Sequence, residues 1–246
     1  TRKGICVRGL MATDDSFQTL THGDLQVTGR LVDASNATLY ATSTFGDQSV
    51  ACIYKPVAGE RPLWDFPDGC LAHREYAAFL VSDLLGFDLV PLTILRDGPY
   101  GPGMVQQWID IDESIDLSQF FSTDHPKLRA MALFDAIINN TDRKIGHLLP
   151  LDQERVLGCD HGVTFHAEDK LRTVLWQWAG DPFTAEEIAL LEAARSQING
   201  KLGELLSPLL TELEILQLER RVSDLLNSGT FPLPSPDWPA VPWPAF

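Results

Sequence analysis

Alternating hydrophobic and polar residues predict that the first third of the chain is an antiparallel sheet. Strand-like runs cover residues 25–32, 38–45 and 49–55. The loops between them, residues 33–36 and 46–47, have the composition of hairpin turns. Upstream, residues 4–12 predict a further short strand, and Asp14-Asp15-Ser16 predicts a capped short helix that ends near Gly23.

A helix and two more strands are predicted after this sheet. Pro56 follows the third strand, and we expect the strand to end there because proline lacks a backbone N–H. Residues 71–85 have helical periodicity and stop at Gly86, a common residue after a helix end. Residues 91–95 and 103–109 then read as strands.

From residue 125 the pattern becomes mostly helical. Helices are predicted at residues 125–139, 184–198 and 211–226, the second of them opened by a capping box at Thr184. The tail from residue 231 is rich in proline and tryptophan and has no helical period, so we expect it to lie across the surface.

The order of strands first and helices second predicts an α+β fold with two lobes and a cleft between them. Residues 1–109 would form a sheet-rich N-terminal lobe with one helix. Residues 110–230 would form a helical C-terminal lobe that carries the catalytic and metal loops, and residues 231–246 the tail. The connection between the lobes is expected at residues 106–112.

The charge balance narrows the range of partners. The 246 residues include 19 Lys and Arg against 34 Asp and Glu, which gives a net charge of −15. Binding to nucleic acid requires a basic face, so we expect no nucleic-acid partner. Attraction to anionic lipids is equally disfavoured, so we expect no stable membrane association.

The cysteines and the apolar runs indicate a cytoplasmic protein. Cys6, Cys52, Cys70 and Cys159 form no Cys-x-x-Cys motif and no cluster with zinc spacing, so we expect reduced thiols. No apolar run approaches the roughly 18 residues of a membrane span. Residues 1–4 lack the apolar core of a signal peptide.

Two acidic residues stand at turns beside buried elements. Asp142 lies in Asn140-Thr141-Asp142-Arg143, after the helix predicted at residues 125–139. Asp160 lies in Cys159-Asp160-His161-Gly162, after a short strand at residues 155–158. Two carboxylates brought together at one cleft need a cation, and Mg²⁺ with a phosphate chain is a common answer. The alternative is that Asp142 merely caps a turn.

Lys55 and Glu75 form a second candidate pair. Glu75 lies between Leu71 and Phe79 at helical spacing, on or beside the buried stripe of its helix. It is either a solvated acid on a broad amphipathic helix or a carboxylate paired with a cation. Lys55, at the end of the adjacent strand, is the natural partner.

Together these residues have the chemistry of phosphoryl transfer. A lysine held by a glutamate can bind the oxygens of an α- or β-phosphate, and Asp142 can accept the proton of an attacking hydroxyl. Asp160 can hold Mg²⁺ between phosphates, and Lys144 can neutralise charge on the transferred group. Ser35 and Asn36, in the first hairpin loop, can offer backbone N–H groups to phosphate oxygens.

The motif Asn140-Thr141-Asp142-Arg143 resembles the catalytic loop of phosphatidylinositol 3- and 4-kinases, above all the type II 4-kinases. Cys159-Asp160-His161-Gly162 is similar to their metal-binding segment. Nearly all of the chain resembles a small actinobacterial family related to these kinases. The resemblance implies an atypical-kinase fold with ATP in the cleft, and it places Gln107 and Trp108 at the hinge beside adenine.

His147 departs from this family pattern. The position five residues after the catalytic aspartate is normally asparagine, an oxygen ligand for a second metal ion. Imidazole suits Mn²⁺ better than Mg²⁺, so His147 as a ligand predicts a preference for Mn²⁺ and weaker binding as the pH falls through roughly 6–7. The alternative is a core histidine, or one that donates a hydrogen bond to Asp142 or to phosphate.

The sequence therefore predicts an ATP-dependent phosphotransferase that uses Mg²⁺ or Mn²⁺. We expect the acceptor to be a soluble small molecule or a protein hydroxyl rather than a lipid, because no basic amphipathic helix is visible. Two alternatives remain open. One is a nucleotide-binding pseudokinase that regulates a partner, which His147 favours. The other is a protein nucleotidyl transferase.

Overall fold

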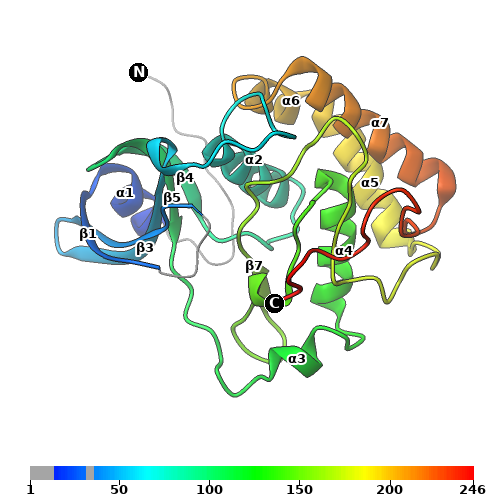
Figure 1. Ribbon diagram of the computed structural model, residues 1–246, viewed down its shortest axis with the longest axis horizontal. Helices are drawn as coiled ribbons and strands as arrows, with labels where there is room; N and C mark the ends of the chain where they lie inside the picture. Colours follow the sequence, from blue (N-terminus) through cyan, green and yellow to red (C-terminus); the bar gives the residue numbers. More distant parts are fainter. Residues whose placement is uncertain (1–13, 32–35) are drawn as a thin grey trace.

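The computed structural model of the chain describes residues 14–31 and 36–246. The strand predicted at residues 4–12 and the candidate phosphate-binding residue Ser35 lie outside these ranges. A five-stranded sheet occupies one end of the molecule, and the helices α4 to α7 occupy the other (Figure 1). This arrangement is the predicted α+β fold, in which the strands of the sheet come first along the chain and most of the helices follow.

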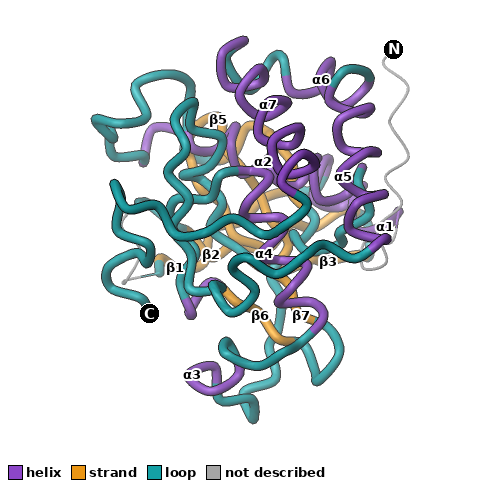
Figure 2. The backbone as a smooth tube through the Cα atoms, turned by 90° about the vertical axis from the view of Figure 1, so that its right-hand side faces the viewer, coloured by secondary structure: helices purple, strands orange, loops and turns teal. Residues whose placement is uncertain are grey.

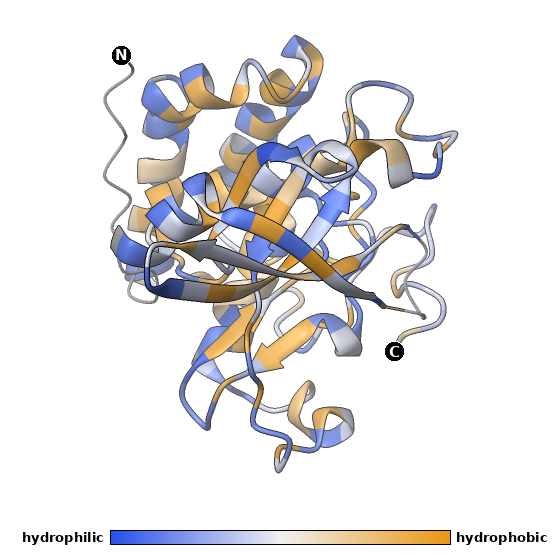
Figure 3. Ribbon diagram, turned by 90° about the vertical axis from the view of Figure 1, so that its left-hand side faces the viewer, coloured by the Kyte–Doolittle hydropathy of each residue, from blue (hydrophilic) through white to orange (hydrophobic). Residues whose placement is uncertain are grey.

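The sheet is antiparallel throughout, as the alternating pattern predicts. Its strands lie in the order β1-β2-β3-β5-β4. Hydrophobic and hydrophilic residues alternate along the strands (Figure 3). The strands are β1 (Asp24–Arg30), β2 (Leu39–Phe45), β3 (Gln48–Pro56), β4 (Thr93–Gly98) and β5 (Gly101–Gln107).

The prediction that the third strand stops before Pro56 is wrong by one residue. Pro56 is the last residue of β3 and pairs with Gly103 of β5. The pairing of β3 with β2 has already ended at Tyr54, so the proline stands at a strand end beside a single neighbour. A missing N–H is tolerated at such a position. A side chain at Gly103 would collide with the carbonyl oxygen of Lys55, so glycine permits this close register.

Two α-helices accompany the sheet. The helix α1 (Asp14–His22) packs on β2 and β3, and α2 (Leu71–Leu84) packs on β4 and β5. The helix α2 also contacts α6 (Lys201–Leu206), so it links the sheet to the helical part of the molecule. It ends as predicted, because Gly86 follows it with a positive φ of 73°, which glycine adopts without strain.

The three long helices predicted in the second half are present, with ends that differ by at most two residues. They are α4 (Pro126–Ile138), α5 (Ala185–Ile198) and α7 (Glu212–Ser228). The capping box at Thr184 is confirmed, and Thr211 forms another at the start of α7. The short helices α3 (Leu117–Phe120) and α6 were not predicted, because so few residues give no clear helical period.

The expectation that the chain is mostly helical after residue 125 is wrong for residues 139–184, although the short strand predicted at residues 155–158 is confirmed. This segment forms loops, a 3-10 turn (Ile145–His147) and a small hairpin of β6 (Leu148–Pro150) and β7 (Val156–Gly158) (Figure 2). Both acidic motifs lie within it. The sequence motifs therefore sit on irregular backbone between α4 and α5, which is where functional groups commonly occur.

The tail lies against the segment that carries the acidic motifs. The carbonyl oxygen of Ala240 accepts hydrogen bonds from the backbone N of Thr173 and from Nε1 of Trp176, and Ala245 accepts one from the backbone N of Ile145. The prediction that the tail crosses the surface is confirmed.

Among the described residues, no helix has the length and apolar character needed to cross a bilayer. Cys52, Cys70 and Cys159 are free thiols.

Candidate active site

Lys55, on β3, contacts acidic residues on two other segments, the helix α2 and the loop that follows β7. Its Nζ lies 2.6 Å from Oε1 of Glu75 on α2 and 2.7 Å from Oδ1 of Asp160. Glu75 also accepts a hydrogen bond from the backbone N of His161 at 2.9 Å through its second oxygen. The structure thus brings three of the predicted site residues together, and it confirms that Glu75 is a buried, paired carboxylate rather than a solvated one.

Lys55 and Asp160 stabilise each other's charges. Burial alone would lower the pKa of Lys55, but the carboxylates of Asp160 and Glu75 raise it above its ordinary value. Lys55, in turn, is the main cause of the depressed pKa of Asp160, whose side chain is half exposed. Glu75 differs, because burial raises its pKa against the effect of Lys55. A lysine between two carboxylates remains charged at neutral pH.

Asp142 is oriented by the end of helix α4. Asn139 ends the helix in a left-handed conformation with φ of 51°, which turns the chain out of the helix. The side chain of Asn140 then accepts a hydrogen bond from the backbone N of Asp142 at 3.0 Å and donates one to Asp135 at 2.9 Å. Asn140 is fully buried, so this turn is fixed to the core.

Beneath Asp142 lies a buried ion pair that the sequence analysis missed. Arg143 and Asp135 are both 0% exposed and are joined by bonds of 2.8 and 2.9 Å. Arg143 also reaches Nε2 of His161 at 2.7 Å. Because an arginine can only donate, His161 accepts at Nε2, and its proton sits on Nδ1. Arg143 thereby fixes the Asp142 loop to the segment that follows Asp160.

Asp142 has the properties expected of a proton acceptor. Burial raises its pKa to about 6, against the opposing effect of Lys144. The Nζ of Lys144 lies 3.6 Å from the Asp142 carboxylate. A carboxylate with a pKa near 6 is ionised at neutral pH and is more basic than an ordinary aspartate.

Asp160 and His147 face each other on the other side of the site. Nε2 of His147 lies 3.4 Å from Oδ2 of Asp160, and Nδ1 lies 3.4 Å from the backbone N of Lys144. Asp160 has a positive φ of 62°, which is uncommon outside glycine and occurs at functional sites. Gly162 follows, where a side chain would press on Leu71 of α2.

The pH window predicted for His147 is wrong. Burial lowers the pKa of His147 to about 4, although Asp160 acts in the opposite direction. The ring is therefore neutral throughout the range of roughly pH 6–7 in which the sequence analysis expected it to titrate. Nδ1 accepts a hydrogen bond from the backbone N of Lys144, so the proton of the neutral ring is on Nε2 and points toward Asp160. Nε2 can donate a lone pair to a metal ion only when this proton moves to Nδ1.

A pocket of about 410 Å³ opens beside Asp142 and Asp160. Its walls come from Asn36, the loop between β3 and α2, the start of α2, the two acidic motifs and Arg172. The lining residues are Asn36, Arg61, Leu63, Asp65, Phe66, Leu71, Thr141, Asp142, Asp160, Gly162, Val163 and Arg172. Asn36 was predicted to lie here, whereas Arg61 and Arg172 were not.

Gln107 and Trp108 stand where the chain leaves the sheet, as the hinge prediction requires, but neither lines this pocket. The backbone N of Gln107 donates to Leu92, and that of Trp108 donates to Ala51. The ring of Trp108 packs edge-on against Tyr40, with 5.2 Å between ring centroids. A contact with adenine stays a prediction.

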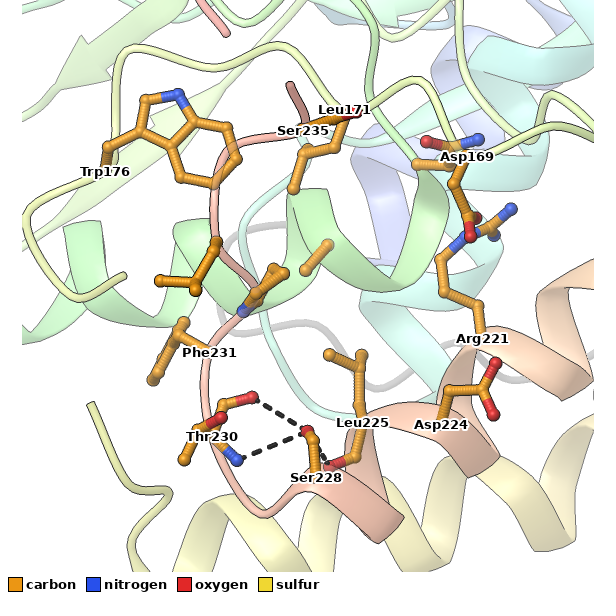
Figure 4. A pocket seen from close by; sticks show the side chains of 14 residues that line it. Asp169, Leu171, Trp176, Arg221, Asp224, Leu225, Ser228, Thr230, Phe231 and Ser235 are labelled. Atoms are coloured by element: carbon orange, nitrogen blue, oxygen red, sulfur yellow. Dashed lines mark hydrogen bonds and ion pairs between the residues drawn. The ribbon is translucent and has the colours of Figure 1, made fainter. Parts of the chain in front are cut away.

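A second pocket, of about 460 Å³, lies on the helical part of the molecule between α4, α7 and the tail (Figure 4). It shares no lining residue with the first pocket and contains none of the predicted site residues. Arg221, at its edge, already donates hydrogen bonds to Asp169, Ile137 and His166. Of the predicted site residues, Asn36, Asp142 and Asp160 line the first pocket, and Lys55, Lys144 and His147 contact these two aspartates.

Comparison with known proteins defines the fold class. The chain aligns with the crystal structure of the Golgi casein kinase at a TM-score of 0.51 and 13% identity, over 89% of this chain and 75% of that one. This similarity shows a kinase-like fold. A kinase of Helicobacter pylori, the proinflammatory CtkA, aligns at a TM-score of 0.48 and 11% identity, over 86% and 94% of the two chains.

The sequence comparison then gives the family. The chain is 42% identical to protein Rv2133c of Mycobacterium tuberculosis over 279 aligned residues, which cover 98% of this chain and all of that protein. It therefore belongs to the same family as Rv2133c. No protein-family model matches the chain. The relation to phosphatidylinositol 3- and 4-kinases thus rests on the short motifs quoted above.

Proposed function

We propose that this protein is an ATP-dependent phosphotransferase of the atypical kinase type. The observation that carries the proposal is the position of Lys55, held between Glu75 and Asp160 in a kinase-like fold. In kinases a lysine paired with a glutamate holds phosphate oxygens, and an aspartate binds the metal ion. Asp142 lines the adjoining pocket, where an acceptor can reach it.

In this proposal each residue has one task. Lys55 binds an oxygen of the α- or β-phosphate, and Glu75 holds the lysine in place. Asp142 accepts the proton of the attacking hydroxyl, for which its raised pKa of about 6 is suited. Lys144, 3.6 Å from Asp142, offsets negative charge on the transferred phosphoryl group. Ser35 and Asn36 offer backbone N–H groups to the phosphate chain.

The residues present fit a divalent cation bound together with nucleotide. Asp160 would supply a carboxylate ligand. His147, whose Nε2 lies 3.4 Å from Asp160, would join it once the proton of the ring is on Nδ1 instead of Nε2. Residues 14–31 and 36–246 contain no group of three or more His, Cys, Asp or Glu side chains that could hold a metal ion alone. Phosphate oxygens and water would therefore complete the coordination, as is usual for Mg²⁺. The bound ion would neutralise charge on the phosphate oxygens.

A second candidate function, a nucleotide-binding pseudokinase, is favoured by His147. This histidine stands where the resembling kinases carry an oxygen ligand for a second metal ion. Its pKa of about 4 keeps the ring neutral, so it offers nitrogen in place of oxygen at this position. Loss of the second metal ion would leave nucleotide binding intact and remove turnover. The partner would then respond to the nucleotide-bound form.

Labelled ATP separates these functions. The protein is incubated with Mg²⁺ or Mn²⁺ and with ATP labelled at the γ- or the α-phosphate, alone and with a small-molecule and protein extract. Transfer of γ-label supports the phosphotransferase. Transfer of α-label to protein indicates a nucleotidyl transferase and contradicts the proposal. Binding without transfer of either label, in every extract tested, indicates a pseudokinase. The Asp142→Asn variant is the control for contaminating kinases.

A further inference from the structure

The pocket beside Asp142 contains two arginines that the catalytic roles above do not use. Arg61 comes from the loop between β3 and α2, and Arg172 from the loop after the Asp160 motif. Hydrogen bonds to neighbouring segments hold the backbone of each arginine in place. The N of Arg61 donates to Asn36 at 2.9 Å. The N of Arg172 donates to the carbonyl of Asn140 at 2.9 Å, and the carbonyl of Arg172 accepts from Arg143 at 3.1 Å.

These hydrogen bonds tie Arg172 to the loop that carries Asp142. A group bound by the Arg172 side chain is consequently held at a defined distance from the proposed proton acceptor. Positioning of this kind is the main contribution of a protein to phosphoryl transfer, because the reaction demands little covalent chemistry from it.

Both guanidinium groups are available for a ligand. Within the described part of the chain, neither makes a hydrogen bond or an ion pair through its side chain. The Nε of Arg172 is buried without a partner, and its guanidinium lies 5.7 Å from the ring centroid of Trp238. The other cations of the site, Lys55, Lys144 and Arg143, are all paired with carboxylates.

Among the described residues of the site, the lysines are paired with carboxylates and the two arginines that line the pocket are not. Asp160 is paired with Lys55, and Asp142 lies beside Lys144. Asp65 is the remaining acid among the lining residues. An anion is the ligand that the two arginines would attract.

We infer that Arg61 and Arg172 form an anion-binding subsite for the acceptor, which is a small hydroxyl compound that also carries a phosphate or carboxylate group. The inference rests on the proposed function. Arginine binds both groups through two parallel hydrogen bonds. The pocket volume of about 410 Å³ suits a small molecule.

The transfer step follows directly. The acceptor hydroxyl oxygen forms a bond to the γ-phosphorus of ATP, the bond from that phosphorus to the β,γ-bridging oxygen breaks, and ADP leaves. The hydroxyl proton passes to Asp142. The anionic group of the acceptor stays on the arginines throughout, so it is not consumed.

Calorimetry with simple anions tests this subsite. Inorganic phosphate and, separately, acetate are titrated into the full chain saturated with Mg²⁺ and the β,γ-imido analogue of ATP. We expect phosphate or acetate to bind while the analogue remains bound. Arg61→Gln and Arg172→Gln should each weaken this binding on the order of 10–100-fold, the usual effect of losing hydrogen bonds to a charged group. Arg195→Gln, an exposed change on α5, should leave it unaltered.

Two further variants refine the result. Arg172→Lys keeps the charge but loses the planar guanidinium group, so its affinity for the anion should lie between those of the parent and Arg172→Gln. Asp65→Asn should tighten anion binding, because it removes the one unpaired acid on the wall. Tighter binding of phosphate than of acetate identifies a phosphate-bearing acceptor, and the reverse identifies a carboxylate.

The outcomes that overturn the inference are distinct from those that overturn the proposed function. Absence of anion binding, or anion binding that the two arginine variants do not weaken, contradicts the subsite. Competition between phosphate and the analogue would assign the arginines to the γ-phosphate instead and also contradict it. Failure of the analogue itself to bind contradicts the phosphotransferase. Arginine-dependent phosphate binding in that case would still support the anion subsite.

Discussion

Lys55 of β3 and Glu75 of α2 are joined by an ion pair of 2.6 Å across the junction of sheet and helix. The glutamate side chain is 2% exposed, so it depends on the lysine and on the backbone N of His161 for its hydrogen bonds. Breaking a buried pair leaves an uncompensated charge, which is strongly unfavourable. The pair therefore fixes the position of Lys55 relative to Asp160 before any nucleotide binds.

The two aspartates should respond differently to mutation. Asp160→Ala removes the proposed metal ligand, so metal-dependent ATP binding should weaken at least about tenfold. Asp142→Asn removes the proton acceptor alone, so ATP binding should be kept and turnover should fall by about 10²–10⁴-fold. Calorimetry and a γ-phosphate transfer assay measure the two effects. If both variants bound nucleotide and turned over like the parent, the assignment of both residues would be wrong.

Turnover should depend on the ionisation of Asp142. Its pKa is raised to about 6 by burial, and only the carboxylate form can accept a proton. The transfer rate should therefore be constant above about pH 7 and fall as the pH drops through 6, approaching tenfold per unit. ATP binding, measured over the same range, serves as the control and should change little. A transfer rate that is flat between pH 7 and 5 would contradict this role.

His147 tests the choice of metal. If the imidazole is a ligand, His147→Asn should shift the ratio of Mn²⁺ to Mg²⁺ affinities toward Mg²⁺, because nitrogen donors favour the later ions. Metal-dependent ATP binding with each ion gives the ratio. His22→Asn, an exposed change at the end of α1, is the matched control. An unaltered ratio in His147→Asn would mean that the histidine contacts Asp160 without binding metal.

The buried pair of Arg143 and Asp135 should dominate the stability of the site. Arg143→Ala leaves Asp135 charged and buried, so we expect the free energy of unfolding to fall by about 3–5 kcal/mol. Arg220→Ala breaks an exposed pair with Asp224, whose side chains are 70% and 65% exposed, and should cost under about 1 kcal/mol. Urea denaturation compares the two. Equal losses would show that Arg143 does not hold the loop.

Most of the long helices and strands, and the ion pair of Lys55 and Glu75, could be predicted from the sequence. Alternation identified β1, β2 and β3, and helical periodicity with capping signals identified α2, α4, α5 and α7. Lys55 and Glu75 could be paired because one ends a strand and the other lies on an apolar helix face. These signals are local, so they can be read without knowledge of the fold.

The rest of the site depends on contacts between distant segments. Asp135 lies among apolar residues of α4, and nothing nearby in the sequence shows that it pairs with Arg143 and bonds Asn140. Arg172 joins the pocket only because its backbone bonds to Asn140 and Arg143. Apart from the strand at residues 155–158, the segment between residues 139 and 184 was not predicted for the same reason, since its shape is set by these long-range bonds and not by periodicity.

The most direct test of the account is a calorimetric titration of Mg²⁺-ATP into the parent and the Lys55→Met variant, with Lys201→Met on the exposed start of α6 as the control. Circular dichroism first verifies that each variant is folded. We predict that the parent and Lys201→Met bind ATP equally and that Lys55→Met binds at least about tenfold more weakly, because it loses a charged hydrogen bond to phosphate. Equal ATP affinity in all three, or no binding by the parent, would contradict the claim that this site binds ATP.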